Sequence, residues 1–338
     1  MNGPVTSSQL QTIIDQLTTL KTQAVAFEKG PVTPTVPPAA ATLIAPGAFG
    51  IMHTQSPTQT FGAADLNAVA PIQGVFASSF GAGDPMQRDD GQYQWDQIDW
   101  SVNRAKGAST PVGVIGMWPG WMTGASGTFA DKANERRPLE QHIGKAAAFA
   151  AAFAQRYAWI KLFAIHSELK GFWDSTRNTW DLEAYLRLYT ACRDAILAVR
   201  PEAKFIGPYI VLEFDVTRDN NISSTWCGPG WVGDERTLQT TLEFLRRAKP
   251  DVIGLDFAPR VTVAGFDPLF KFTDLLNEKG FRQPILVLET YVNGNPVLWV
   301  QALKRARTYP QGFGLMAWDE AGKNPPLTAE LASQIKLA

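Results

Sequence analysis

The chain has 338 residues, of which 45% are hydrophobic and 19% are charged, a globular composition with ample material for a core. Its net charge is −1, from 31 basic and 32 acidic side chains without a block of one sign. The clustered basic face of a nucleic-acid binder is therefore not indicated, and the lack of any run of about 18 apolar residues excludes a membrane-spanning helix.

An amphipathic helix is predicted near the start of the chain, over residues 7–28. Its apolar residues recur at alternating spacings of three and four, which is typical of a heptad seam: Leu10, Ile13, Leu17, Leu20, Ala24 and Phe27. Such a helix suits a coiled coil that joins copies of the chain, and it equally suits a single helix docked on a domain. Five prolines follow within residues 31–47. We therefore expect a helix in residues 1–30 and a proline-rich linker in residues 31–47.

Short apolar runs alternate with helical patterns through residues 48–338, as expected for β/α units. The expected strands are 49–54, 72–80, 112–118, 160–168, 205–211, 252–257, 285–291 and 314–318. The expected helices are 62–69, 94–106, 138–157, 181–199, 236–248, 268–279 and 296–307, and Asp181 is a suitable N-cap for one of them. The pattern predicts a (β/α)8 TIM barrel, preceded by the N-terminal amphipathic helix and the proline-rich linker.

Two of the expected strands end in a glutamate. Phe163–Glu168 and Pro284–Thr290 are apolar runs that carry Glu168 and Glu289 at their ends. A carboxylate at the end of a buried strand is costly unless it has partners or a task, and strand ends face the active site of such barrels. A pair of carboxylates of unequal pKa is what the hydrolysis of a glycosidic bond requires. A structural salt bridge is the alternative for either glutamate alone.

Several segments, in order, resemble the clan A retaining glycoside hydrolases, and within them glycoside hydrolase family 39. The resemblance covers about residues 48–320. Its pieces are Tyr93–Asp99, Met117–Trp121, Phe163–Glu168, Phe172–Trp173, Ile206–Pro208, Pro284–Tyr291 and Ala317–Trp318.

The resemblance implies that Glu168 is the acid/base, that Glu289 is the nucleophile, and that Trp318 forms part of the floor of a sugar subsite. Two departures stand out. The family usually has asparagine before its acid/base glutamate, whereas this chain has Ser167, whose hydroxyl forms fewer hydrogen bonds. The histidine and tyrosine usual at the end of strand six are also missing, and Asp256 stands in that segment. We therefore expect an unusual sugar rather than xylose.

Other polar and aromatic residues near strand ends are candidates for substrate binding. His166 and His53 are compatible with a substrate contact or with a buried structural role. Asp256 suits a sugar hydroxyl or an ion pair with Arg260. The remaining candidates are the aromatic residues Trp118, Trp121, Trp173 and Tyr291.

Metal and cofactor sites are not predicted. The three histidines are scattered, and the spacing of the two cysteines, Cys192 and Cys227, is not that of a zinc site. Whether these cysteines form a disulfide is left open. The glycine-rich dinucleotide fingerprint and the nucleophile elbow of serine esterases are also absent from the sequence.

Two functions remain in view: a retaining glycoside hydrolase acting on a polysaccharide or oligosaccharide, and a non-catalytic glycan-binding barrel in a larger assembly such as a phage tail. The carbohydrate is the expected partner in both. Residues 1–6 lack the features of a secretion signal. The predicted helix and linker suit a virion-associated or extracellular protein, and they equally suit a protein that has lost its leader.

Overall fold

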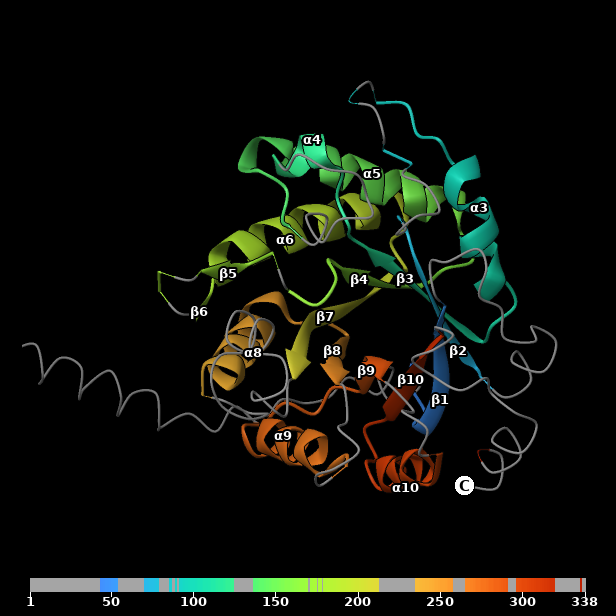
Figure 1. The fold of residues 1–338 in the computed structure, drawn as a ribbon, viewed down its shortest axis with the longest axis vertical. Coiled ribbons are helices and arrows are strands. Elements are labelled where there is room, and N and C mark those ends of the chain that lie inside the picture. Colours follow the sequence, from blue (N-terminus) through green and yellow to red (C-terminus); the bar gives the residue numbers. More distant parts are fainter. Residues whose placement is uncertain are drawn as a thin grey trace, which may run out of the picture. The chain divides into compact units, whose positions relative to one another are not determined.

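The computed structural model describes residues 43–53, 70–78, 85–86, 89, 91–124, 136–169, 171–174, 176–177, 179–212, 235–257, 265–290, 296–319 and 335. Within these residues, eight parallel strands close into a barrel in the order β1-β10-β9-β8-β7-β4-β3-β2 (Figure 1). The strands are β1 (Pro46–His53), β2 (Ile72–Phe76), β3 (Thr110–Ile115), β4 (Leu162–Ile165), β7 (Lys204–Leu212), β8 (Val252–Phe257), β9 (Ile285–Thr290) and β10 (Phe313–Asp319). The predicted (β/α)8 barrel is confirmed.

Helices connect the strands and surround the barrel in Figure 1. They are α3 (Asp96–Val102), η2 (Asn103–Ala105), α4 (Gly120–Thr123), η4 (Glu140–His142), α5 (Ile143–Arg156), α6 (Leu182–Val199), α8 (Glu235–Ala248), α9 (Asp267–Glu278) and α10 (Pro296–Ala306). A small antiparallel hairpin, β5 (Trp173–Asp174) and β6 (Thr179–Trp180), follows β4. The predicted N-cap of α6 is confirmed, because the Asp181 side chain accepts a hydrogen bond from the Ala184 N–H at 3.2 Å.

Several boundaries differ from the sequence-based expectation, and two of them concern the linker and the candidate site. Strand β1 begins at Pro46, which pairs with Phe313, so the last two residues of the expected linker belong to the barrel. Strand β4 ends at Ile165, three residues before Glu168. The predicted helices 7–28 and 62–69 lie outside the described residues, and oligomerisation through the first stays a prediction.

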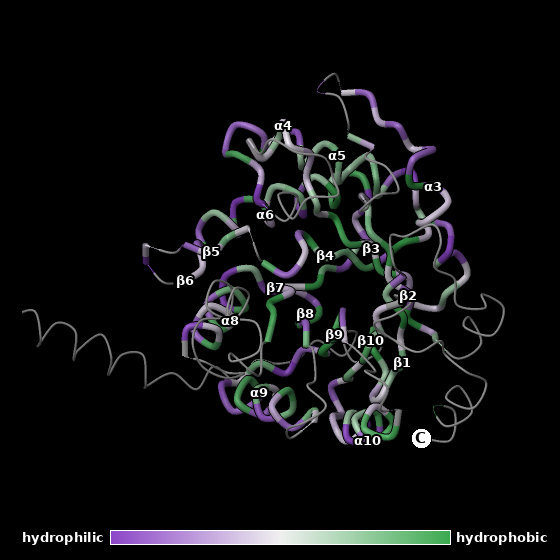
Figure 2. Tube along the Cα trace, viewed as in Figure 1, coloured by the Kyte–Doolittle hydropathy of each residue, from purple (hydrophilic) through white to green (hydrophobic). Residues whose placement is uncertain are grey.

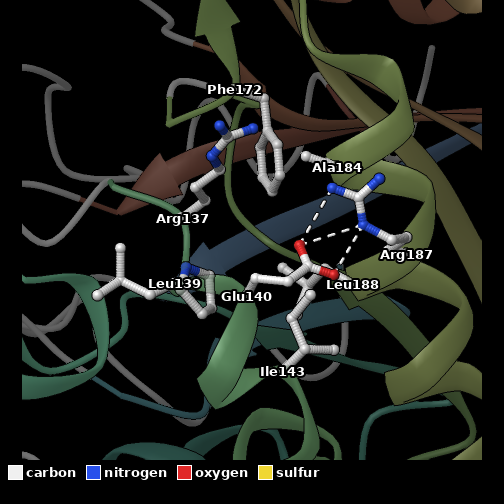
Figure 3. Close-up of a pocket in the computed structure, with 9 residues that line it drawn as sticks. Arg137, Leu139, Glu140, Ile143, Phe172, Ala184, Arg187 and Leu188 are labelled. Atoms are coloured by element: carbon white, nitrogen blue, oxygen red, sulfur yellow. Dashed lines mark hydrogen bonds and ion pairs between the residues drawn. The ribbon is translucent and has the colours of Figure 1, made fainter.

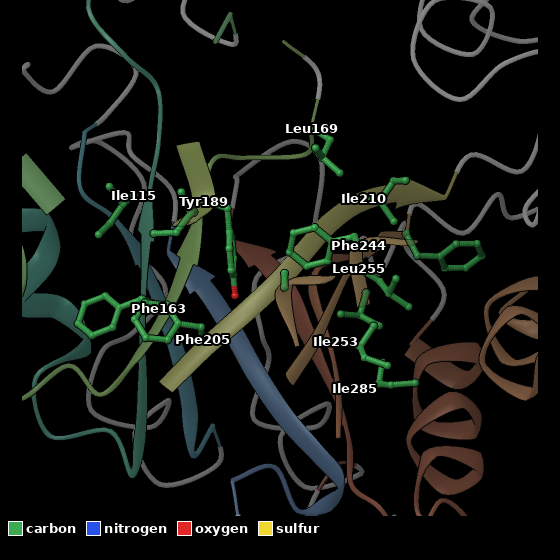
Figure 4. Close-up of a cluster of buried hydrophobic side chains, with 14 of the residues drawn as sticks. Ile115, Phe163, Leu169, Tyr189, Phe205, Ile210, Phe244, Ile253, Leu255 and Ile285 are labelled. Atoms are coloured by element: carbon green, nitrogen blue, oxygen red, sulfur yellow. The ribbon is translucent and has the colours of Figure 1, made fainter. Parts of the chain in front are cut away.

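The barrel wall separates two apolar cores. The inner core fills the barrel with side chains such as Ile206, Leu286 and Met316. The outer core lies between the wall and the helices (Figure 4), where Tyr189 and Phe244 have ring centroids 5.0 Å apart. Hydrophobic residues gather on β3, β4 and β10 in Figure 2, as expected for strands buried on both faces.

Two questions raised by the sequence are answered in part. Cys192 in α6 is a fully buried free cysteine, and burial raises the pKa of its thiol, so it is a core side chain. Cys227 lies outside the described residues. None of the described helices combines the length and the hydropathy that crossing a membrane would require.

Candidate functional site

Three acidic side chains converge at the C-terminal ends of the barrel strands. Glu168 follows β4, Asp256 belongs to β8 and Glu289 belongs to β9. A carboxylate oxygen of each lies within 4.8 Å of those of the other two. Asp256 and Glu289 are 5% and 6% exposed, whereas Glu168 is half-buried. The two glutamates singled out by the sequence therefore meet, and Asp256 joins them. This is the end of a (β/α)8 barrel at which active sites lie.

A bulge in β9 turns Glu289 toward this mouth. Leu286 and Leu288 belong to the inner core and Val287 to the outer core, so regular alternation would send Glu289 outward. The register shifts at this point: Leu255 pairs with Val287, but Asp256 pairs with Glu289. The extra residue leaves both Leu288 and Glu289 on the inner side. Thr290 then faces outward, where its hydroxyl accepts a hydrogen bond from Trp299 Nε1 at 3.1 Å.

Glu168 reaches the mouth through a sharp bend after β4. His166 and Glu168 have φ angles of 65° and 57°, in the left-handed region that residues other than glycine rarely adopt. Gly116 after β3 permits this path, because a Cβ there would lie 3.0 Å from His166 Cα and 3.0 Å from Ser167 N. The bend replaces the simple strand end that the sequence suggested. Backbone strain of this kind is often kept at functional sites.

His166, two residues before Glu168, is held by aromatic neighbours. Trp118 Nε1 donates a hydrogen bond to His166 Nδ1 at 3.1 Å, and the Phe172 ring lies edge-on at 4.9 Å. With Nδ1 as the acceptor, the hydrogen of a neutral imidazole is on Nε2. His166 is 1% exposed and Trp118 is fully buried. These contacts fix the bend that carries Glu168.

Tyr209 is a site residue that the sequence analysis did not identify. It is the extra residue of a bulge in β7, with a φ angle of 53°, and it is fully buried in the inner core. Burial raises the pKa of Tyr209 well above its ordinary value, and the charges of Glu289, Asp256 and Glu168 raise it further. The nearby Ser167 side chain lowers the pKa of Tyr209 by a smaller amount. The phenol therefore keeps its hydrogen and can donate it to a carboxylate.

A second tyrosine connects the two distorted strands from behind. Tyr185 in α6 lies with its hydroxyl oxygen 3.0 Å from the Ile165 carbonyl oxygen and 3.1 Å from the Pro208 carbonyl oxygen. These carbonyl groups immediately precede His166 and Tyr209, the first residues with positive φ in each bend. Tyr185 thus ties together the two bends that shape the mouth.

The other predicted residues lie at varying distances from this cluster. Trp318 belongs to the inner core, is 9% exposed, and contacts Phe76 edge-on at 5.8 Å, and its role in a sugar subsite stays a prediction. His53 Nε2 lies 2.8 Å from Gln73 Oε1 in the wall between β1 and β2. Tyr291 and Arg260 lie outside the described residues.

Trp121 and Trp173 are half-buried and have protein partners. Trp121 Nε1 donates to the Met86 carbonyl oxygen at 2.9 Å, and the Lys145 ammonium lies 5.3 Å from the centre of its ring. Trp173 in the β5–β6 hairpin packs edge-on against Trp180 at 5.0 Å. Their role in substrate binding stays a prediction.

A separate cavity of about 130 Å³ opens between η4 and α6 (Figure 3). Phe172 and Leu188 contribute apolar lining, and Glu140 binds Arg187 across it, with Nε and Oε1 2.9 Å apart. The two charged residues satisfy each other. This cavity holds none of the three clustered carboxylates.

The described residues contain one group of side chains with the spacing of metal ligands, and it is Glu168, Asp256 and Glu289. Carboxylate oxygens are ligands that Mg²⁺ and Ca²⁺ prefer, so the cluster has affinity for positive charge in general. Which cation the cluster would bind depends on how many of the three carboxyl groups are ionised.

Comparison with known proteins identifies the fold. No family model and no curated protein match the chain. Among solved structures, a glucosidase from Croceicoccus marinus has a TM-score of 0.57 at 10% identity and covers 85% of this chain and 66% of its own. A GH39 enzyme from Xanthomonas axonopodis pv. citri has a TM-score of 0.54 at 15% identity and covers 86% of this chain and 63% of its own.

A third similar structure is a psychrophilic family 10 endo-β-1,4-xylanase, with a TM-score of 0.51 at 12% identity, which covers 83% of this chain and 87% of its own. The chain spans slightly less than two thirds of the length of the first two structures. At these identities the likeness concerns the fold alone. The chain has the barrel fold of these glycoside hydrolases, and the resemblance to family 39 holds at that level.

Proposed function

We propose that the protein is a retaining glycoside hydrolase that cleaves a polysaccharide or oligosaccharide by double displacement. One observation carries the proposal: the carboxylate oxygens of Glu168 and Glu289 lie within 4.8 Å of each other. Retaining enzymes hold their two carboxyl groups about 5–5.5 Å apart, whereas inverting enzymes leave about 6.5–9.5 Å for a water molecule. The short separation favours a direct attack by one carboxylate.

In the first step, Glu289 attacks the anomeric carbon while Glu168 protonates the glycosidic oxygen. The bond between these atoms breaks, the leaving sugar departs with the proton, and a glycosyl ester forms on Glu289. In the second step, Glu168 removes a proton from water, whose oxygen attacks the anomeric carbon and releases Glu289. The buried position of Glu289 suits the nucleophile, and the more exposed Glu168 can exchange protons with solvent.

Neighbouring side chains support this assignment of roles. Tyr209 can donate its hydroxyl hydrogen to Glu289 and stabilise its ionised form, because its own pKa is raised. Trp318 lies near the C-terminal end of β10 and offers an apolar ring, against which the C–H face of a sugar can pack. Together these groups orient a sugar ring above the two glutamates.

A glycan-binding barrel without turnover is the second candidate. Ser167 favours it, because the family that the sequence resembles usually has asparagine there, and a hydroxyl offers fewer hydrogen bonds to the sugar. Retention of both glutamates within 4.8 Å opposes it. The two candidates differ in whether any substrate is turned over.

The test is a screen of aryl glycosides and bacterial polysaccharides for release of reducing ends by the full chain. We expect turnover of at least one substrate, and its loss in Glu289→Gln and Glu168→Gln. The exposed Glu278 at the end of α9 provides the matched control, and Glu278→Gln should behave as the wild type. Binding of a glycan that neither the wild type nor the control cleaves would favour the non-catalytic barrel.

A further inference from the structure

Asp256 is one carboxylate more than double displacement requires. It is the register partner of Glu289 on the neighbouring strand, and regular alternation along β8 turns it into the barrel mouth. Val252 lies on the same inner side, and Ile253 and Leu255 lie on the outer one. Two ionised carboxylates this close repel each other in a buried site. A positively charged group of a ligand would be attracted to both carboxylates.

Two buried hydroxyl groups near the three carboxylates indicate that this site binds a ligand. Tyr209 Oη and Ser167 Oγ have no hydrogen-bond partner among the described residues, although Tyr209 is fully buried and Ser167 is 4% exposed. The two hydroxyls lie near each other, and Tyr209 also lies near the three carboxylates. Buried polar groups without partners are rare, and a bound polar group is one way to satisfy them.

We propose that the mouth recognises a positively charged amino group of an amino sugar, held between Asp256 and Glu289. The proposal rests on the proposed function, because it takes the sugar to be the one attacked by Glu289. The substituent on the carbon next to the anomeric carbon then lies beside the nucleophile. An ammonium group there would donate hydrogen bonds to Asp256, to the second oxygen of Glu289 and to Tyr209 Oη.

The spacing of the oxygens suits an ammonium group. Acceptors about 2.8 Å from a tetrahedral nitrogen lie about 4.6 Å apart, which agrees with carboxylate oxygens within 4.8 Å of one another. An N-acetyl group is neutral and larger, so it offers the carboxylates no charge. The substrate class is therefore a glycan that contains a 2-amino sugar with a free amine.

Catalysis favours an ammonium ion over a metal ion. Glu168 must carry a proton before the first step, whereas a divalent cation held by all three carboxylates would need them deprotonated. An ammonium group between Asp256 and Glu289 leaves Glu168 free to hold that proton. A metal ion in the same place would exclude double displacement.

The experiment titrates the full chain at about pH 6, where the amines are protonated, and follows binding by ligand-observed NMR. The probes are D-glucosamine, D-galactosamine and D-mannosamine, each with its N-acetyl form and its parent hexose. At least one hexosamine should bind about 10- to 100-fold more tightly than both neutral counterparts, the range expected for charged hydrogen bonds. Asp256→Asn should remove most of this preference.

Asp251 provides the matched control on the same strand segment. It lies just before β8, at the opposite end of the barrel, where its carboxylate accepts a hydrogen bond from the Phe205 N–H at 2.9 Å. Asp251→Asn should keep the wild-type preference. Thermal unfolding of Asp256→Asn, together with its affinity for the parent hexose, separates a lost ammonium contact from a misfolded barrel.

Several results would overturn the proposal. Equal binding of hexosamine and hexose, an unchanged preference in Asp256→Asn, or no hexosamine binding up to about 50 mM, well above millimolar affinity, would each do so. Displacement of the hexosamine by calcium or magnesium chloride, with one ion bound per chain, would identify a metal site instead. Turnover of a neutral glycan without any hexosamine preference would remove this inference and leave the proposed function standing. A preference without turnover of any substrate would remove the proposed function alone.

Discussion

Two places in the barrel wall bury polar side chains, and they do so in opposite ways. Between β1 and β2, His53 and Gln73 are 4% and 1% exposed and lie 2.8 Å apart as a complementary pair. At the mouth, Glu168, Asp256 and Glu289 bring three groups of the same sign within 4.8 Å of one another. The first arrangement pairs two polar groups with each other inside the protein. The second concentrates charge of one sign at the mouth.

The difference separates structural polar groups from functional ones. A complementary buried pair stabilises the fold, and removing one partner costs the desolvation of the other. A cluster of like charges lowers stability, and chains keep such a cluster when activity depends on it. The strained bends at His166 and Tyr209 lie at the mouth and add to the same pattern.

The largest expected effect is the loss of turnover when one of the two glutamates is replaced. Glu289→Ala should lower kcat by roughly 10⁴-fold or more on every substrate, because no group remains to form the covalent intermediate. Glu168→Ala should lower it by about 10²–10⁴-fold on substrates with poor leaving groups and far less on an activated aryl glycoside. Steady-state kinetics on a matched pair of substrates measures both. Equal losses on both substrates in Glu168→Ala would contradict its role as acid.

A smaller effect on activity is expected from Tyr209→Phe. The change removes only the hydroxyl, which lies within electrostatic range of Glu289, so kcat should fall by about 10-fold, as expected for one hydrogen bond to a charged group during catalysis. The acidic limb of the pH–rate profile should move to higher pH, because the variant lacks the hydroxyl that in our proposal donates to ionised Glu289. The profile of kcat/KM measures this. An unchanged limb with lower stability would indicate a packing role alone.

The two polar regions should respond with opposite signs in stability. Gln73→Leu should lower the free energy of unfolding by about 1–3 kcal/mol, because His53 Nε2 loses its Gln73 partner, while kcat stays near wild type. Glu289→Gln should raise the free energy of unfolding by about 1 kcal/mol and abolish turnover, because it removes one of three like charges. Chemical denaturation compares them. A stabilising Gln73→Leu would remove the distinction drawn between the two regions.

The smallest effect concerns a complementary pair at the surface. Asp99 in α3 binds the Arg156 guanidinium, with Nε and Oδ1 3.0 Å apart, and Arg156 holds the pKa of Asp99 below its ordinary value. A lowered carboxyl pKa stabilises the fold at neutral pH, and this contribution is lost as the pH falls below about 4. Asp99→Asn should cost about 0.5–1 kcal/mol at neutral pH. The cost should shrink progressively as the pH falls below about 4, and a constant cost across this range would contradict an electrostatic origin.

Much of the fold and part of the site follow from the sequence. The alternation of apolar runs and helical patterns predicts the barrel, and regular alternation along β8 places Asp256 inward. The same rule would send Glu289 outward, and only the bulge in β9 brings it to the mouth. A bulge depends on the register between neighbouring strands, which one strand's own sequence does not reveal.

Tyr209 and Glu168 illustrate the same limit. Tyr209 reads as one more apolar residue of a buried strand, and its inward direction depends on the β7 bulge and a positive φ. The sequence pattern places Glu168 at the end of a strand, but its position depends on the bend that Gly116 permits and Tyr185 holds through the Ile165 carbonyl. The elements were predictable, whereas the local distortions that assemble the site arise from tertiary contacts.

The stereochemistry of azide rescue tests the central claim most directly. Azide added to Glu168→Ala with an activated aryl glycoside should yield a glycosyl azide of retained configuration, because the Glu289 ester forms and azide then displaces it. Azide added to Glu289→Ala should yield the inverted product in one displacement. Proton NMR of the anomeric position distinguishes the two. The reverse assignment of products would exchange the roles of the two glutamates, and inversion by the wild-type enzyme on its own substrate would contradict double displacement at this site.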